Sequence, residues 1–144
     1  MNSVGTRLAY FRKKCGYTLS EAADMVGISR NTLASYESGK TKLPLSAAIK
    51  LINLYNCDVY DIFEVHAAKD DVLAPYEIAK IQAGCAVLRE MNTGILNLPD
   101  EYYKKKFKSY VVHHMNKTQF APNVSEDEID KDTEELFRET FLKE

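Results

Sequence analysis

Apolar residues recur at helical spacing from the start of the chain. Leu8, Phe11 and Cys15 lie three or four positions apart, which predicts an amphipathic helix over roughly residues 3–15. Gly16 can close this helix in a left-handed conformation. Strict alternation of apolar and polar residues, the pattern of a strand, is poor along the whole sequence. We therefore expect an all-α protein.

Two short helices are predicted next, with a tight turn between them. Thr18 and Glu21 form a capping-box pattern, so a second helix begins there and ends at Gly27. Ser29 offers an N-cap for a third helix, which Gly39 ends. The sequence thus predicts a helix, a tight turn and another helix between residues 18 and 39.

The N-terminal region closes with two further helices and a break in the pattern. After a basic loop, apolar spacing predicts helices over residues 45–55 and 58–63. The stretch EVHAAKDD then breaks periodicity, so we expect a five-helix domain at residues 1–66 and a helical region at 67–144. The predicted core of the first domain consists of its inward-facing apolar residues: Leu8, Phe11, Ala23, Val26, Ile28, Leu33, Leu51, Leu54, Ile62 and Phe63.

The C-terminal region carries three apolar stripes, which predict about three helices. Residues 75–91 have apolar side chains at spacings of 3, 4 and 3, typical of a short a/d seam between helices. The seam consists of Ile78, Ile81, Cys85 and Leu88. Asp100 can cap the next helix, and Ser125 with Glu128 can begin the last. Their stripes are Tyr103, Phe107, Tyr110, Val111 and His114, then Ile129, Leu136, Phe137 and Phe141.

Charge is unevenly divided along the chain. The formal net charge is −2, yet residues 1–45 carry seven basic and three acidic groups, and residues 125–144 carry three basic and nine acidic groups. The excess of basic residues in the N-terminal region predicts a polyanionic partner. The acidic end has its own apolar stripe, which favours packing over mimicry of nucleic acid. The lysines at 104–106 and 108 are interpreted as a solvated face.

Composition narrows the class of protein. Hydrophobic residues make up 45% of the chain, which is typical of a folded protein. No apolar run approaches the ~20 residues that span a bilayer. The N-terminus lacks the apolar core of a secretory signal, and the three cysteines are odd in number and widely spaced, as suits reduced thiols. We expect a cytoplasmic protein with no membrane partner.

Patterns for catalysis and metal binding are missing from the sequence. No nucleophile–base pair, phosphate-binding loop or metal-ligand cluster is apparent, so we expect neither an enzyme nor a cofactor. His113 and His114 are neighbours that point about 100° apart on a helix, so they cannot chelate one metal ion together. Cys85 lies on an apolar stripe, where a small buried or interface residue is expected.

The third predicted helix has a polar face with the chemistry of base recognition. Arg30, Asn31 and Ser35 share one exposed surface of this helix. Arginine can contact guanine through two hydrogen bonds, and asparagine can do the same for adenine. Small side chains at Ala34 and Ser35 allow close approach to a groove. The segment therefore has the features of a recognition helix, and the alternative is a capped surface helix of an ordinary all-α domain.

A longer pattern of residues surrounds this helix. It consists of Thr18, Glu21, Ala23, Gly27, Ile28, Ser29, Thr32, Leu33, Glu37, Gly39, Pro44 and the segment DVYDIF. With these residues, positions 3–64 resemble the lambda-repressor-like helix-turn-helix family, the Cro and Xre type of bacterial and phage regulators. The resemblance covers less than half of the chain and does not extend to residues 67–144. It implies a five-helix DNA-binding domain.

The resemblance also implies which residues contact double-stranded DNA. Base or groove contacts would come from Ser29, Arg30, Asn31 and Ser35, and phosphate contacts from Lys40, Thr41 and Lys42. The family pairs an arginine of helix 1 with the glutamate that ends helix 3, here Arg12 with Glu37, which we expect to be partly exposed. The sequence departs from the family at Leu19, where a glutamine usually clamps phosphate. The hydroxyl of Thr18 and the N–H groups of its helix would serve there instead.

Two functions of different classes are compatible with these observations. The first is a transcriptional repressor that binds a palindromic operator as a homodimer through the seam at residues 75–91. The second is an adaptor or antitoxin-like protein whose C-terminal helices bind a partner protein. The C-terminal helices could also form a monomeric bundle.

Overall fold

All regular elements of the described residues are α-helices, as predicted. The computed structural model describes residues 3–63, 75–93, 98–116 and 124–140. The chain divides into two compact units, Met1–Val72 and Leu73–Glu144. The predicted domain boundary at residues 66–67 lies outside the described residues. Among the described helices, none is both long and apolar enough to cross a membrane.

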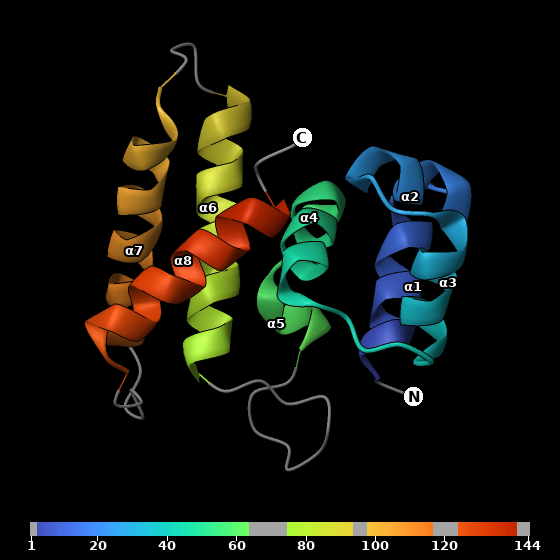
Figure 1. Ribbon diagram of the computed structural model, residues 1–144. Coiled ribbons are helices and arrows are strands. Elements are labelled where there is room, and N and C mark those ends of the chain that lie inside the picture. Colours follow the sequence, from blue (N-terminus) through green and yellow to red (C-terminus); the bar gives the residue numbers. More distant parts are fainter. Residues whose placement is uncertain (1–2, 64–74, 94–97, 117–123, 141–144) are drawn as a thin grey trace. The chain divides into compact units, whose positions relative to one another are not determined.

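The N-terminal unit contains the five helices expected from the sequence (Figure 1). They are α1 (Val4–Lys14), α2 (Leu19–Val26), α3 (Arg30–Ser38), α4 (Leu45–Tyr55) and α5 (Val59–Ile62). Helix α1 packs against α3 and α5, and α2 packs against α3 and α4. Helix α3 therefore rests on two other helices along one side and leaves its opposite side open.

Side chains at the helix ends explain where these short helices begin and stop. Thr18 accepts a hydrogen bond from the Glu21 N–H at 3.1 Å, and the Glu21 carboxylate accepts one from the Thr18 N–H at 2.9 Å. Ser29 accepts a bond from the Thr32 N–H at 3.0 Å. Helix α3 ends at Gly39, whose φ of 80° is left-handed and suits glycine. The caps predicted at Thr18 and Ser29 are therefore confirmed.

The predicted core of the first unit is mostly correct but contains three errors. Phe11, Ile28 and Leu54 are partly exposed, whereas the other seven predicted residues are buried. Phe11 borders the solvent-exposed side of α1, because its ring contacts the ring of its neighbour Tyr10, which is 58% exposed. Ile28 sits in the turn before α3, and Leu54 in the last turn of α4. Buried residues that the prediction left out include Ala22, Tyr36, Leu43, Ala48, Ile49, Ile52, Tyr55 and Val59.

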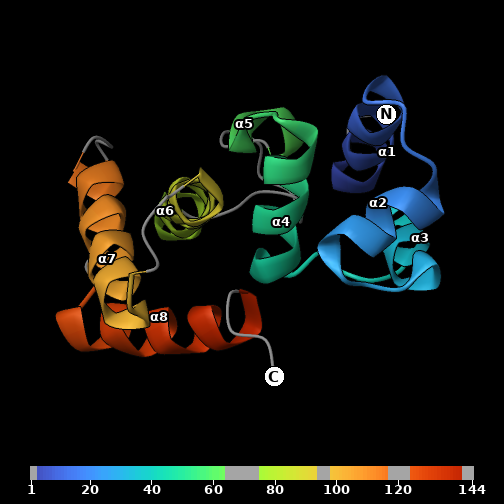
Figure 2. The ribbon, with the colours of Figure 1, turned by 90° about the horizontal axis from the view of Figure 1, so that it is seen from above.

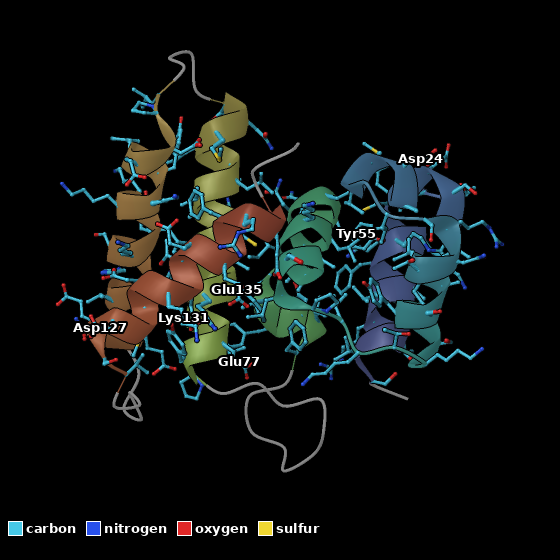
Figure 3. All side chains as sticks on the ribbon, in the orientation of Figure 1. Asp24, Tyr55, Glu77, Asp127, Lys131 and Glu135 are labelled. Atoms are coloured by element: carbon cyan, nitrogen blue, oxygen red, sulfur yellow. The ribbon has the colours of Figure 1, made fainter. Side chains whose placement is uncertain are left out.

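Tyr55 of α4 has an unusual environment in this core (Figure 3). It is 3% exposed, and its hydroxyl has no hydrogen-bond partner among the described residues. Burial raises the pKa of Tyr55 well above its ordinary value, so the hydroxyl stays neutral. A buried hydroxyl without a partner costs stability, which makes Tyr55 a useful position for mutation.

The C-terminal unit is built from three longer helices. They are α6 (Pro75–Thr93), α7 (Asp100–Asn116) and α8 (Glu126–Thr140). Helices α6 and α7 lie side by side, and α8 crosses both of them (Figures 1 and 2). Figure 3 shows Asp127, Lys131 and Glu135 along the outer side of α8, where all three are exposed. Residues 126–140 of the acidic end are therefore part of a folded helix across the unit.

The core of this unit is aromatic at its centre. Phe107 and Phe137 are fully buried, with ring centroids 5.9 Å apart and planes at 84°. This edge-to-face arrangement is a favoured geometry for aromatic pairs. Among the predicted stripe residues, Tyr110 and His114 are only partly buried. Phe141, which was assigned to the last stripe, lies outside the described residues.

Candidate nucleic-acid interface

The outer side of α3 carries the polar residues that the sequence singled out. Arg30 and Asn31 are exposed, and Ser35 is partly exposed. On the inner side, Leu33 is 0% and Tyr36 is 9% exposed. Burial of these two side chains fixes the rotation of α3, so its polar side must face outward. Arg30, Asn31 and Ser35 are therefore presented together on one accessible surface.

The turn before α3 is rigidly built. Gly27 adopts a left-handed φ of 78° and ends α2. The N–H of Ile28 donates to the carbonyl of Ala23 at 3.0 Å. Ser29 then caps α3, and its hydroxyl lies 2.7 Å from that of Thr32. Ser29 is exposed but already occupied as a helix cap, so its first role is to start the helix.

An ion pair joins α1 to the end of α3, as the resemblance implied. The Arg12 Nε lies 2.7 Å from Glu37 Oε2, and its second guanidinium nitrogen lies 3.0 Å from Oε1. Arg12 also donates to the carbonyl of Tyr17 at 2.9 Å. The hydrogen bond to Glu37 raises the pKa of Arg12 above its ordinary value, so the guanidinium remains charged. This two-bonded pair holds α3 in one orientation against α1.

The expectation that this pair is partly exposed holds for Glu37, whereas Arg12 is buried. Each side chain is only 10% exposed, because α1 and α3 pack directly against each other there. A pair with so little exposure is screened weakly by salt, and loss of one partner leaves an unpaired charge. The sequence could place the two residues together but could not show how closely the helices enclose them.

A short basic loop follows α3. Lys40, Thr41 and Lys42 are all exposed, while the next residue, Leu43, is 9% exposed. The N–H groups of Lys40 and Thr41 both donate to the carbonyl of Ser35, at 3.0 and 3.3 Å. The loop is therefore tied to the last turn of α3 at one end and to the core at the other. Its two ammonium groups can reach anions beside α3.

The start of α2 is the second place where the sequence predicts a phosphate contact. Glu21 accepts a bond from the Thr18 N–H, so its carboxylate already occupies the N-terminus of α2. Thr18 itself is exposed, and its oxygen accepts from Glu21 while its hydroxyl hydrogen remains available for donation. Leu19 contributes no polar group. The exposed Thr18 hydroxyl can contact a phosphate here.

One close packing position in α1 was not predicted from the sequence. Gly5 is buried on the side of α1 that also carries Leu8 and Arg12. The sequence carried a weak signal, because a glycine inside a predicted helix, where no turn is needed, lowers helix propensity relative to alanine.

The predicted dimerisation residues lie on α6. Ile78, Ile81 and Cys85 are buried in the single chain, and Leu88 is partly exposed. Helical geometry puts the first three on the side of α6 opposite to Tyr76, which donates a hydrogen bond to Asp132 of α8 at 2.6 Å. Their part in a dimer stays a prediction. Any dimer formed through them must first uncover three buried side chains.

The lysines of α7 are not simply a solvated face. Lys104 lies 2.8 Å from Glu134 and its side chain is 12% exposed. Lys108 lies 2.8 Å from Asp130. The correction has a clear cause, because α8 places its acidic flank beside α7, an arrangement that the sequence could not show.

In the part of the chain that the structure describes, no group of three or more metal-binding side chains is gathered.

Comparison with known proteins gives the same assignment for the first unit. A family model described as helix-turn-helix matches residues 8–62. The HTH-type transcriptional regulator ImmR of Bacillus subtilis is 32% identical over 99 residues, which cover 69% of this chain and 70% of that protein. This likeness is longer than the N-terminal unit, Met1–Val72, so it extends into the C-terminal helices.

Archaeal proteins are similar over shorter stretches. An uncharacterised HTH-type transcriptional regulator of Archaeoglobus fulgidus is 38% identical over 58 residues, which cover 40% of this chain and 83% of that protein. An HTH-type transcriptional regulatory protein of Pyrococcus abyssi is 36% identical over 70 residues, 49% of this chain but only 22% of that longer protein. No solved structure matches the chain.

Proposed function

The chain belongs to the helix-turn-helix family of transcriptional regulators, and on that basis we propose that it is a repressor that binds a palindromic operator as a homodimer. The observation that carries the proposal is the outer side of α3. Arg30 and Asn31 are exposed there on a helix whose rotation is fixed by buried Leu33 and Tyr36. A rigid helix with short polar and basic side chains is what the major groove of DNA accepts.

Base recognition is proposed to come from the N-terminal half of α3. Arg30 would contact guanine through its O6 and N7 atoms, and Asn31 would contact adenine through N6 and N7. Ser35, one turn further along, would allow close approach and add a groove contact. Ser29 would support this surface through its cap and contact the groove edge with its hydroxyl.

Phosphate contacts are proposed to flank the recognition helix. Lys40, Thr41 and Lys42 form the exposed basic loop beside the end of α3. Thr18 would donate its hydroxyl hydrogen to the phosphate backbone from the start of α2. Such contacts set the register and the affinity of the domain, whereas base contacts set its preference for sequence.

A homodimer is proposed because the surface that would read DNA is small. One short helix reads only a few base pairs, which cannot compete against the non-specific sites of a genome. Two copies related by symmetry would read two half-sites about 34–36 Å apart, and their binding energies would combine. We assign the dimer contact to the seam of Ile78, Ile81, Cys85 and Leu88, of which Leu88 is partly exposed and the other three would have to be uncovered. A dimer seated across a promoter would exclude the transcription machinery.

The experiment has two parts. Genomic fragments retained by the full chain are sequenced, and the expected result is a palindrome whose half-sites are one DNA turn apart. Sedimentation then compares the full chain with residues 1–72, and a dimer is expected for the full chain only. Bound fragments without symmetry, together with a monomeric full chain, would contradict the dimer. They would favour the alternative, in which the C-terminal helices bind another protein.

A further inference from the structure

Gly5 has a contact with α3 that no other residue type would allow. We propose that Gly5 is a positioning residue for sequence reading, because it lets the backbone of α1 touch the backbone of α3 at the turn that leads into the basic loop. The proposal rests on the function proposed above. It adds a residue that touches no DNA and acts through Tyr36 and Glu37.

The evidence is the space around Gly5. A Cβ atom added to it would lie 2.2 Å from the carbonyl oxygen of Glu37 and 2.7 Å from that of Tyr36. Contacts of Cβ atoms below 3.0 Å are essentially never observed in proteins. Both obstacles are backbone atoms, so no side chain can rotate away to make room. Any larger residue must therefore move one helix relative to the other.

The backbone conformation gives no other reason for a glycine at this position. Gly16, Gly27 and Gly39 have φ values between 78° and 82°, where side chains are strained, but Gly5 lies inside α1 and is not among the residues with positive φ. Alanine is the better helix former at such a position. Because helix propensity favours alanine, the close approach of α3 remains as the reason for glycine.

The two carbonyls that Gly5 touches belong to the end of α3. The carbonyl of Tyr36 accepts a hydrogen bond from the N–H of Gly39 at 3.3 Å, which closes the helix before Lys40. Glu37 is held a second time through its side chain, by Arg12. Gly5 and Arg12 lie seven residues apart, two turns along the same side of α1. The end of α3 is therefore fixed by one backbone contact and one ion pair.

Gly5 contacts the end of α3 that is opposite to Arg30 and Asn31, so its substitution should affect specific and non-specific DNA binding differently. Arg30 and Asn31 begin α3, whereas Gly5 contacts its last turn. A displaced last turn would shift the loop of Lys40 and Lys42 relative to the base-reading residues. Specific binding needs both sets of contacts in register, but non-specific binding can adapt to a small shift. Gly5→Ala should therefore reduce specific binding more than non-specific binding.

The test uses the full chain and two DNA duplexes. One duplex carries the selected site, and the other has the same composition in scrambled order. Gly5→Ala should lower affinity for the selected site at least about tenfold and affinity for the scrambled duplex less than about threefold. Ile49→Val, a mild core substitution in α4, is the control for lost stability and should leave the ratio of the two affinities unchanged.

The remaining outcomes each decide the question. If wild-type protein prefers no sequence, the function proposed above fails and the role of Gly5 fails with it. If wild-type protein prefers the selected site and Gly5→Ala keeps the full preference, only the role of Gly5 is refuted. Should Gly5→Ala not fold, it is measured in the Tyr55→Phe background against Tyr55→Phe alone. If that double variant also fails to fold, Gly5 serves overall stability and the proposal is rejected.

Discussion

The two units of the chain hold their helices together in different ways. The N-terminal unit has helices of 4 to 11 residues, with side-chain caps at Ser3, Thr18 and Ser29 and left-handed residues after α2, α3 and α4. The C-terminal unit has helices of 15 to 19 residues. Its helices are joined by an aromatic core and by ion pairs from α8 to α6 and α7.

The ion pairs of the two units show what this difference means. Arg12 and Glu37 are each 10% exposed and bonded at two points, so they fix one orientation of α3. Lys108 and Asp130 are 37% and 48% exposed, so water and salt weaken their attraction. The first pair restrains the orientation of α3, and the second adds little to a helix that its apolar side already holds.

The largest effect is expected from the aromatic core of the C-terminal unit. Phe107→Ala removes a fully buried ring and its contact with Phe137, so it should destabilise that unit by about 3–5 kcal/mol. NMR amide signals followed through a urea titration report each unit separately. The signals of α1 to α5 should keep their midpoint. A common shift of both units would show that the two units unfold together.

The next largest effect is expected at the ion pair between α1 and α3. Glu37→Gln leaves the Arg12 charge largely buried without a counter-charge, so it should cost the N-terminal unit about 3 kcal/mol. The matched control is Glu134→Gln, which breaks the pair with Lys104 at a glutamate that is 54% exposed. This control should cost less than about 1 kcal/mol. Equal losses in urea titrations would remove the contrast between the two kinds of pair.

Smaller effects, opposite in sign to each other, are expected when the hydroxyl groups of two buried tyrosines are removed. Tyr55→Phe removes a hydroxyl without a partner and should stabilise the N-terminal unit by about 1 kcal/mol. Tyr76→Phe removes a hydroxyl that donates to Asp132, so it should destabilise the C-terminal unit by about 1 kcal/mol. Melting temperatures of the two variants should move in opposite directions. A loss of stability in Tyr55→Phe would mean that its hydroxyl is satisfied.

The smallest effect is expected on the flank of α8. Lys108→Gln breaks an ion pair with Asp130 that is well exposed, so it should cost less than about 0.5 kcal/mol. Lys105→Gln, at an exposed lysine of the same helix, is the control for the loss of one charge. Both are compared by urea titration at low and high salt. A cost above about 1 kcal/mol for Lys108 alone would show that these pairs specify the position of α8.

The sequence was a good guide to the N-terminal unit because its signals are local. Caps at Thr18 and Ser29, and glycines at helix ends, act within a few residues of where they stand. The outward side of α3 followed from the inward side, since a helix has a fixed period. The family resemblance added the partner of Arg12, which lies 25 residues away and has no local signal.

The parts that the sequence did not reveal depend on how helices approach each other. Gly5 gains its importance only because α3 crosses α1 at that point. Lys104 and Lys108 meet acids of α8 that lie far along the chain. Helix α6 has buried residues around most of its circumference, so one apolar stripe could not indicate which side meets which neighbour. Spacing predicts the faces of a helix but not their partners.

The most direct test of the proposed interface compares Arg30→Ala with Lys42→Ala on the selected DNA site and its single-base variants. Arg30→Ala should reduce the free energy of binding to the selected site by about 1–3 kcal/mol, and the variant should lose sequence preference at one base pair only. Lys42→Ala should weaken binding to every sequence alike. It should also make the slope of log affinity against log salt concentration shallower, by the amount expected for about one phosphate contact. If Arg30→Ala kept full discrimination at every position, α3 would not be the helix that reads the DNA.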